Sequence, residues 1–575
     1  MAEWRKNWPD ILAAVALLAL IAMGWCCANG IWSRNEFDLP SSYTARSKSD
    51  VIFHLALIRA AADGHFVPLR SKINSNLGAP FAANWNDWPI TEEIPIFATG
   101  LLARLIGLIA ALNVALLAGH LLCGLTFYFV ARYCKVRITW AFVSALACGL
   151  GCYLFAQSPD HFLLVLCWHL PLFLLVWNWT SSDVGVQPGS KRFWFSCGVA
   201  FITGLQMPYY TGIFCQLVLI GALVMFVRSR RLPALLSAFC FIGSAALAFS
   251  LMHLDTWTYQ YRFGPNPGAL DRPYQWLELY GLKLVDLIVP PINHHAEIMG
   301  HFAQWRQSIS VLADEGSYLG LIGIASLLLL AGTSINEVIK RSARHIPVET
   351  WQTLWVILFF GTGGLNAILG LAGFTYFRAG CRYSVVIFVV TLLYAVRAVD
   401  GWTRKSSVIK FFAATLACLL IFWDQVPAAP SKSARDRIAQ EIASDRTFVA
   451  ELERSLPEHA MIFQLPVMDF PEGPLPDVPS YDHLRPYLFS SHLRFSFGSM
   501  KGRPREEWQH VLTSLPLPQV LAEIKSRGFV ALYINRAAYA HTSLESDLAT
   551  LGYERKIENS MGDLVCYLMD SAPIP

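Results

Sequence analysis

The feature that most constrains this chain is a series of long apolar segments. Because an α-helix rises about 1.5 Å per residue, roughly 18 to 20 apolar residues cross the hydrocarbon core of a bilayer. Such segments lie at 11–32, 112–131, 138–157, 161–179, 193–207, 209–227, 233–253, 316–335, 351–373, 382–398 and 408–424. With 54% hydrophobic and 15% charged residues, the 575-residue chain is predicted to be an all-α polytopic membrane protein with about eleven spans.

Two apolar segments need a separate interpretation. The segment 94–108 carries Arg104 and is short for a span, so we expect it to lie along the membrane surface. The first span follows Arg5 and Lys6, as a secretory signal would. It is too long for a signal and lacks a small-residue cleavage site, so we interpret it as a retained anchor.

The basic residues predict the orientation of the spans. They collect in alternate loops, at 5–6, 132–137, 191–192, 228–231, 340–344 and 404–405. The positive-inside rule then places the N-terminus in the cytoplasm. The loops 33–93 and 254–315, the short turn 374–382 and the region from about 425 are predicted to lie outside. The formal net charge of +4, without a polybasic tail, gives no indication of nucleic-acid binding.

The C-terminal region differs in character from the rest. After Pro427 and Pro430, apolar strand-like runs alternate with amphipathic helical patterns. We therefore predict a transmembrane domain at 1–424 and an extracytoplasmic (periplasmic) α/β domain at 425–575. Its predicted elements are a helix at 433–454, a strand at 461–465, helices at 504–514 and 517–527, a strand at 529–534, a helix at 542–551 and a strand at 564–569.

Asp50 lies just beyond the first span, in the long outer loop. Ser47 to Asp50 match a capping box ahead of an apolar run, so the acid has an ordinary structural explanation. A carboxylate in the first helical turn can still direct one oxygen outward and act as a base. His54 follows one turn later on the same face and is a further candidate catalytic residue, although a surface histidine is more often only solvated.

The segment 74–89 of the same loop is rich in Asn, Gly, Pro and Trp. These residues build turns, and Trp is common at membrane interfaces, so a plain loop is one interpretation. Flat apolar faces beside amide and carboxylate groups also suit sugar rings. The candidate substrate-binding residues are Asn84, Trp85, Asp87 and Trp88.

Further polar residues stand at the predicted outer ends of spans. Asp160 and His161 begin the fourth span, and His169 follows two turns later. Ionisable groups at or within a span are costly unless they pair or face a water-filled cavity, so both histidines are functional candidates. His161, at the outer rim, is the stronger of the two, because the deeper His169 has an ordinary explanation in a hydrogen bond to a neighbouring helix. Arg378 and Arg382 lie in an outward turn, against the positive-inside bias, and the Tyr383 that follows them is a further candidate substrate-binding residue. The planar guanidinium fork suits phosphate oxygens, although pairing with lipid headgroups or outer-loop acids would also explain these arginines.

No metal site is predicted. The outer loop 254–315 contains His294, His295, Glu297 and His301, but their spacing matches no standard zinc pattern. We therefore predict no cofactor, while a divalent metal stays open.

Taken together, these features resemble the GT-C superfamily of integral-membrane glycosyltransferases, which includes protein O-mannosyltransferases, oligosaccharyltransferase catalytic subunits and aminoarabinose transferases. The shared features are an Asp after the first span, a many-helix body, an arginine-bearing outer turn and a soluble C-terminal domain. More narrowly, the motifs at 76–80, 84–89, 158–161 and 378–384 resemble bacterial GT-C-like membrane proteins of this length.

The resemblance implies transfer of a sugar from a polyprenyl-phosphate carrier to an acceptor glycan, lipid or protein at the outer face of a bacterial inner membrane. It implies inversion, Asp50 as base, Arg378 and Arg382 on the leaving phosphate, and His161 at the rim. The first loop has no Asp-x-Glu or Asp-x-Asp pair, so Asp87, Glu92 and Glu93 are candidates for a second acid.

Two other classes of function stay open. A flippase or transporter of lipid-linked sugars would need polar residues threaded through its spans, and most spans here are plain Leu, Ala and Phe. A non-catalytic assembly protein of a cell-surface polysaccharide system would use the C-terminal domain as its binding module.

Overall fold

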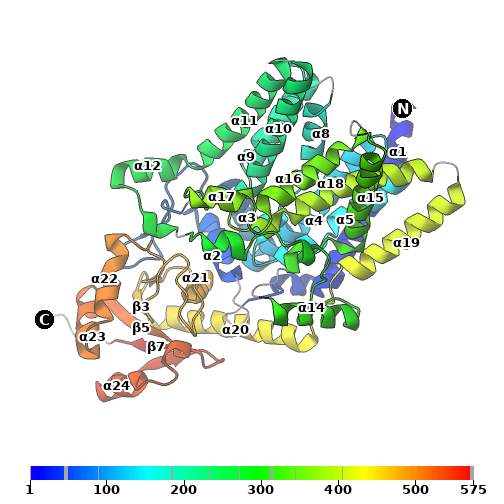
Figure 1. The fold of residues 1–575 in the computed structure, drawn as a ribbon. Helices are drawn as coiled ribbons and strands as arrows, with labels where there is room; N and C mark the ends of the chain where they lie inside the picture. Colours follow the sequence, from blue (N-terminus) through cyan, green and yellow to red (C-terminus); the bar gives the residue numbers. More distant parts are fainter. Residues whose placement is uncertain are drawn as a thin grey trace.

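The computed structural model describes residues 2–43, 50–88, 90–182, 186–230, 232–270, 272–310, 315–342, 345–403 and 406–569. Most of this chain is helical (Figure 1). Eight segments among the described residues are long and apolar enough to cross a membrane. They comprise α1 (Ala2–Asn29), α4 (Leu108–Tyr133), α5 (Ile138–Gly149) with α6 (Cys152–Gln157), α10 (Pro208–Ser229), α11 (Leu232–Met252), α15 (Gly320–Ile339), α18 (Ser384–Trp402) and α19 (Ser407–Gln425). The predicted polytopic all-α body is thereby confirmed.

The predicted count of eleven spans is not confirmed, because three of the predicted segments form shorter or interrupted helices. The segment 161–179 is divided into α7 (Phe162–Val165) and α8 (Leu170–Thr180). The segment 193–207 forms the short helix α9 (Lys191–Gly204). The segment 351–373 is divided into α16 (Val348–Phe360) and α17 (Leu365–Leu371) at a turn that contains Gly361, Gly363 and Gly364. Glycine breaks the helix there because it is conformationally free.

Arginines of the predicted cytoplasmic loops come together at one end of the helical body. The Arg132 Nε lies 2.6 Å from the Asp10 Oδ1, which joins the end of α4 to the start of α1. The Arg137 Nε lies 2.7 Å from the Asp400 Oδ1, which joins the α4–α5 turn to the end of α18. The opposite end carries the long connecting segments, and it is called the outer end below because the basic residues of the sequence predict that it faces outward.

Two helices of the first long loop pack together at the outer end. They are α2 (Val51–Asp63) and α3 (Glu93–Ile106), and α3 also contacts α4. The backbones of α2 and α3 approach closely at Gly100, where an added Cβ would lie 2.5 Å from the Cβ of Ala61. Between them, β1 (Ile73–Asn74) and β2 (Ala83–Asn84) form a short antiparallel pair. The second long loop contains α12 (Leu254–Phe263), α13 (Gln275–Leu279) and α14 (Glu297–Ile309).

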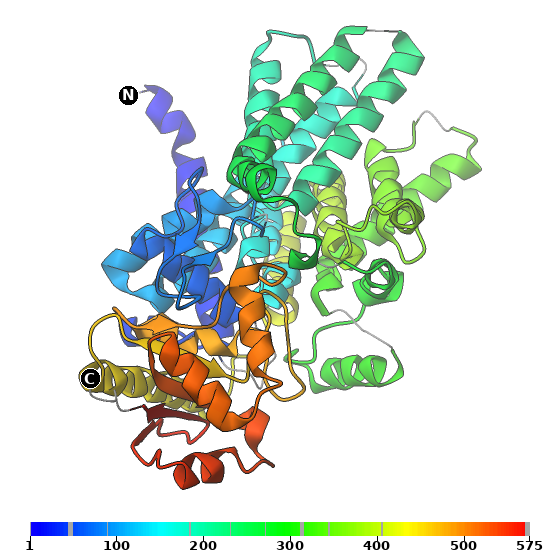
Figure 2. The same ribbon diagram turned by 90° about the vertical axis from the view of Figure 1, so that its left-hand side faces the viewer.

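A small five-stranded sheet forms the centre of the C-terminal region, below the helical body in both ribbon views (Figures 1 and 2). The strand order is β4-β3-β5-β7-β6, and the β3 pairs are parallel while the β7 pairs are antiparallel. The strands are β3 (Met461–Leu465), β4 (Arg494–Phe495), β5 (Phe529–Asn535), β6 (Lys556–Glu558) and β7 (Leu564–Leu568). The helices are α20 (Lys432–Ser455), α21 (Arg485–Phe489), α22 (Pro504–Leu512), α23 (Leu517–Ser526) and α24 (Leu544–Thr550). The predicted C-terminal α/β fold is confirmed.

The two faces of this sheet pack against different partners. Alternate strand residues such as Phe463 and Leu532 pack against α22, α23 and α24. The intervening residues, such as Ile462 and Tyr533, belong to one core with α20, α21 and the membrane helices. Successive side chains of a strand point to opposite faces of the sheet. Because both faces of this sheet are covered, each strand is a continuous apolar run in the sequence.

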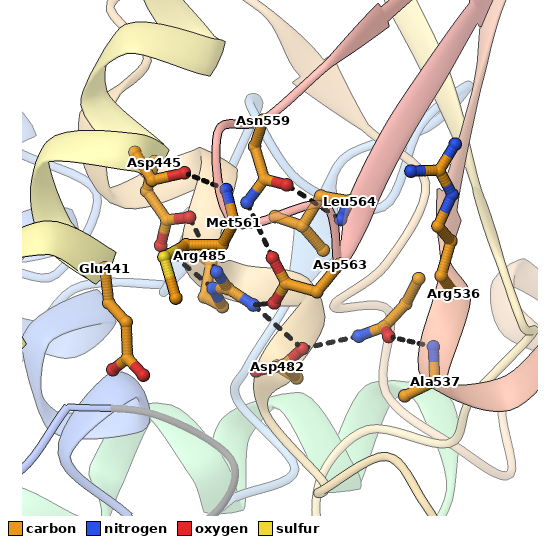
Figure 3. A network of polar contacts seen from close by, with 12 residues as sticks. Glu441, Asp445, Asp482, Arg485, Arg536, Ala537, Asn559, Met561, Asp563 and Leu564 are labelled. Atoms are coloured by element: carbon orange, nitrogen blue, oxygen red, sulfur yellow. Dashed lines mark hydrogen bonds and ion pairs between the residues drawn. The ribbon is translucent and has the colours of Figure 1, made fainter. Parts of the chain in front are cut away.

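Buried ion pairs around Arg485 fasten the C-terminal region together (Figure 3). Its guanidinium donates to both Asp445 carboxylate oxygens at 2.9 and 2.7 Å and to Asp563 at 2.8 Å. The Tyr43 hydroxyl, from the first long loop, donates to Asp445 at 2.8 Å. The network therefore joins α20, α21 and the β6–β7 turn to a segment that follows the first span.

Candidate functional site

Asp50 begins α2 at the outer end and stays accessible. It is the N-cap residue, yet its side chain makes no capping hydrogen bond with α2. The other capping-box residues, Ser47 to Ser49, lie outside the described residues. The Asp50 side chain keeps 46% of its surface exposed, and its Oδ2 lies 3.8 Å from the His161 Nε2. The carboxylate is thus held by its backbone and directed toward a histidine from a distant part of the chain.

The surroundings of Asp50 disfavour its charged form. Partial burial raises the pKa of Asp50 to about 6, and the nearby negative charges of Asp160 and Glu472 add to the effect. The positive charges of Arg382 and Arg378 oppose it. A carboxyl group with a pKa near neutral pH can both accept and return a proton, which is the requirement for general acid–base chemistry.

The two predicted histidines differ in position. His161 is 40% exposed beside Asp50, and burial of the ring together with the charge of Arg382 lowers its pKa well below the ordinary value. His54 is buried with its ring 5.3 Å from that of Phe162 in an edge-on arrangement. Burial lowers the pKa of His54 to about 4. Both rings are therefore neutral at pH 7, and His161 is the one that reaches the open side of Asp50.

The predicted arginines lie over aromatic rings near this carboxylate. Arg378 follows α17, and its Cζ lies 4.3 Å from the centre of the Trp276 ring. Arg382 lies in the short 3-10 helix Gly380–Tyr383 at the start of α18, with its Cζ 5.0 Å from the Tyr209 ring. Guanidinium groups stack on aromatic faces and keep their N–H groups available at the edge. The arrangement thus presents two oriented cations on the side of Asp50.

Glu472 is a site residue that the sequence did not indicate. It comes from the loop after β3, where its φ of 57° lies in the left-handed region. Its carboxylate accepts from Arg272 at 2.5 and 3.1 Å and lies 3.8 Å from the Arg378 Nη2. The Pro-Glu-Gly-Pro sequence at 471–474 indicates a turn but carries no signal of the distant arginines that Glu472 meets.

An aromatic cluster joins this loop to α2. Tyr481 stacks on Phe53 with 4.6 Å between ring centres and 21° between planes. Phe470 stacks on Trp85 at 5.5 Å, and Trp88 meets Phe53 edge-on at 6.0 Å. The cluster is adjacent to Asp50, since Phe53 lies one turn along the same helix.

The predicted substrate-binding residues occupy different environments. Trp85 is buried and its Nε1 donates to the Gly498 carbonyl at 3.0 Å. Asp87 is buried and accepts from Arg503 at 2.7 and 2.8 Å. These two side chains attach the outer loop to the C-terminal region. Trp88 is half-buried beside Phe53.

Two further predicted residues lie within the packing. Asn84 is half-buried, and its Oδ1 accepts from the Asn86 backbone at 3.0 Å. Tyr383 is buried and stacks on Phe360 with 3.4 Å between ring centres. The structure thus brings Asp50, His161 and the two arginines together, with His54 and Tyr383 in the packing around them.

Two of the three candidates for a second acid, Glu92 and Glu93, lie at the start of α3. Glu92 caps α3, and burial raises its pKa to about 7 while the charge of Arg382 opposes the shift. Glu93 is buried in an ion pair with Lys72. In the second long loop, the His294 Nε2 lies 3.4 Å from the Asp424 Oδ1, at the end of α19. Glu92 is therefore the candidate whose pKa responds to the charge of Arg382.

Comparison with known proteins gives distant structural matches. No protein-family model matches the chain, and no curated protein does. Among solved structures it is similar to the Archaeoglobus fulgidus oligosaccharyltransferase tethered with an acceptor peptide, with 12% identity and a TM-score of 0.44 over 100% of this chain and 75% of that one. The arabinofuranosyltransferase AftD from Mycobacteria matches with 13% identity and a TM-score of 0.46 over 92% of this chain and 37% of that one.

ArnT from Cupriavidus metallidurans matches with 13% identity and a TM-score of 0.44 over 98% of both chains. A second structure of the same ArnT, bound to undecaprenyl phosphate, matches with 11% identity and a TM-score of 0.42 over 97% of this chain and 98% of that one. The functional argument below depends on the site itself.

Proposed function

We propose that this protein is a membrane glycosyltransferase that moves a sugar from a polyprenyl-phosphate carrier to an acceptor glycan, lipid or protein at the outer face of the membrane. The observation that carries the proposal is the accessible Asp50 carboxylate, with a pKa of about 6, on the same side as the guanidinium groups of Arg378 and Arg382. Such a transfer uses a general base for the acceptor hydroxyl and cations that offset the charge of the leaving phosphate, and Asp50 and the two arginines are groups of these kinds.

The reaction divides between these groups. Asp50 accepts the proton of an acceptor hydroxyl while the acceptor oxygen forms a bond to the anomeric carbon of the sugar. The bond between that carbon and the carrier phosphate breaks, and the phosphate leaves with the bonding electrons. Arg378 and Arg382 hold the leaving phosphate and offset its growing negative charge. Attack from the side opposite the phosphate inverts the anomeric centre.

The remaining predicted residues take supporting roles in this proposal. Neutral His161, whose Nε2 lies 3.8 Å from the Asp50 Oδ2, hydrogen-bonds to the acceptor at the rim. Trp88, which is half-buried beside Phe53, offers an aromatic face to the sugar. Trp85 and Asp87 hold the outer loop in place against the C-terminal region.

A transfer assay on the purified protein tests the proposal. Synthetic polyprenyl-phosphate sugars and a panel of glycan, lipid and peptide acceptors are supplied, and the wild type is compared with Asp50→Asn. We expect product from the wild type and a rate lower by about 10²- to 10⁴-fold from the variant. Asp63→Asn, at the exposed far end of the same helix, is the matched control and should transfer at the wild-type rate.

An undiminished rate from a folded Asp50→Asn protein would show that Asp50 is not the base. Movement of a sugar lipid across vesicles without any transfer would instead favour a flippase.

A further inference from the structure

We propose that the C-terminal region contains a zinc-binding site formed by Asp469, Glu506 and His510. Their ligand atoms lie within 4.8 Å of one another, and no other group of three such side chains is found in the part of the chain that the structure describes. The site lies outside the arginine and Asp50 cluster and does not depend on the proposed function.

Two separate elements supply the three side chains. Glu506 and His510 are four residues apart on α22, so they project from one face of the helix. Asp469 comes from the loop after β3, and its Oδ1 lies 2.9 Å from the His510 Nε2. The same nitrogen also contacts Glu506. A helix and a loop distant in sequence thus converge on one point.

Burial and charge both favour a cation at this point. The Glu506 side chain is 5% exposed, while Asp469 and His510 keep 46% and 42% of their side-chain surface exposed. A buried carboxylate needs a counter-charge, and the open side gives an ion access. The arginines at the start of α22 are engaged elsewhere, Arg503 with Asp87 and Arg505 over the Phe81 ring.

The donor set indicates zinc. One imidazole nitrogen with two carboxylate oxygens suits Zn²⁺, whereas Mg²⁺ and Ca²⁺ prefer oxygen ligands alone. Three protein ligands leave a fourth position for water. Ligand atoms about 2.1 Å from a tetrahedral zinc lie roughly 3.4 Å apart. The Asp469 and His510 side chains therefore need to separate by about half an ångström from their present contact, and His510 and Glu506, which lie closer together, by more than that.

Zinc at this site would hold the loop that reaches the candidate active site. Asp469 directly precedes Phe470, which stacks on Trp85, and lies three residues before Glu472. An ion bound to Asp469 would fix this loop against α22. Only this consequence rests on the proposed function; the binding itself can be measured without any transfer assay.

The test uses the full-length protein, stripped with a chelator and titrated with Zn²⁺ by calorimetry and with Co²⁺ by absorption. We expect one ion per chain and binding at least tenfold weaker in His510→Ala and in Asp469→Asn. His492→Ala is the matched control, since His492 lies 3.6 Å from a single carboxylate, that of Glu453, and should bind as the wild type does.

Two results would overturn the proposal. One is that the wild-type protein binds no Zn²⁺ at micromolar concentrations. In that case His510 would only pair, in its protonated form, with the two carboxylates. The other is equal binding by the wild type and His510→Ala. Asp469 is half-exposed, so Asp469→Asn keeps the test valid even if the His510 variant folds poorly.

Discussion

Asp50 combines two properties that usually exclude each other in a carboxylate. It is accessible, yet its environment raises its pKa from 3.8 to about 6. The folded protein therefore holds the Asp50 proton more tightly than the unfolded chain does, and this residue costs stability as the pH rises from about 4 to above 6. Because Asn cannot ionise, we expect Asp50→Asn to be at least as stable as the wild type at pH 7.5.

The pKa of Asp50 predicts a pH profile. The proposed base works only when deprotonated, so the transfer rate should rise about tenfold per pH unit below pH 6 and level off above it. Initial rates at saturating donor between pH 4.5 and 8 measure this step. A rate that is flat across pH 5 to 7 would rule out Asp50 as the rate-controlling base.

Arg382 provides a test of phosphate recognition. Lysine retains the charge of arginine but loses the planar fork and the stacking on Tyr209. We expect Arg382→Lys to raise the KM for the polyprenyl-phosphate donor by about tenfold while the KM for the acceptor stays constant. Arg262→Lys, an exposed arginine on α12, serves as the control and should change neither value. An unchanged donor KM in Arg382→Lys would remove this arginine from the phosphate site.

At the scale of elements, the loop between β3 and α21 supplies Glu472 to the arginine cluster. In the proposed reaction its carboxylate would compete with a donor phosphate for Arg272 and Arg378, and its charge raises the pKa of Asp50. We expect Glu472→Gln to lower the donor KM several-fold and to move the midpoint of the pH profile to lower pH.

Kinetics across pH with Glu472→Gln and with the exposed Glu507→Gln would test both effects. A midpoint that does not move would show that Glu472 does not act on Asp50.

Elements with strong local patterns were predictable from the sequence, and elements decided by distant contacts were not. The strands β3, β5 and β7 were predicted to within a residue because each is a continuous apolar run buried on both faces. The segments 161–179 and 351–373 look apolar enough to span, but α7 and α8 are separate helices and α16 ends at Gly361. A hydropathy average measures the composition of a segment and does not detect a break in the helix within it.

Only some of the residues that meet at the candidate site were apparent from the sequence. Asp50, His161, Arg378 and Arg382 stand out because charge is unusual at the end of a span. Glu472 lies in an unremarkable turn, and its role depends on a contact with a loop two hundred residues earlier in the chain. The buried roles of Trp85 and Asp87 follow from Gly498 and Arg503, which no local pattern connects to them.

At the scale of the whole molecule, the Asp87–Arg503 ion pair fastens the C-terminal region to the membrane body. The Asp87 side chain has no exposed surface and that of Arg503 is 16% exposed. Removal of one partner leaves the other charge buried, so we expect Asp87→Ala to cost about 3 kcal/mol of stability. Glu523→Ala breaks the exposed pair with Arg527 and should cost less than about 1 kcal/mol.

Chemical unfolding in mild detergent compares these two variants. Equal stability losses would contradict the fastening role of Asp87. Asp87→Ala with Arg503→Ala together should lose less than the sum of the two single losses, because the pair is one interaction.

The stacking of Tyr481 on Phe53 also has a consequence for the order in which parts of the protein are synthesised and come together. These two residues are more than four hundred positions apart, and a ribosome that adds about 5–20 residues per second needs roughly 20 to 80 seconds to make the intervening chain. The strand β7, which lies between β5 and β6, is the last of the five strands to be made. The membrane helices are therefore synthesised before the loop that carries Glu472 and Tyr481, and the five-stranded sheet can close only after β7 has been made.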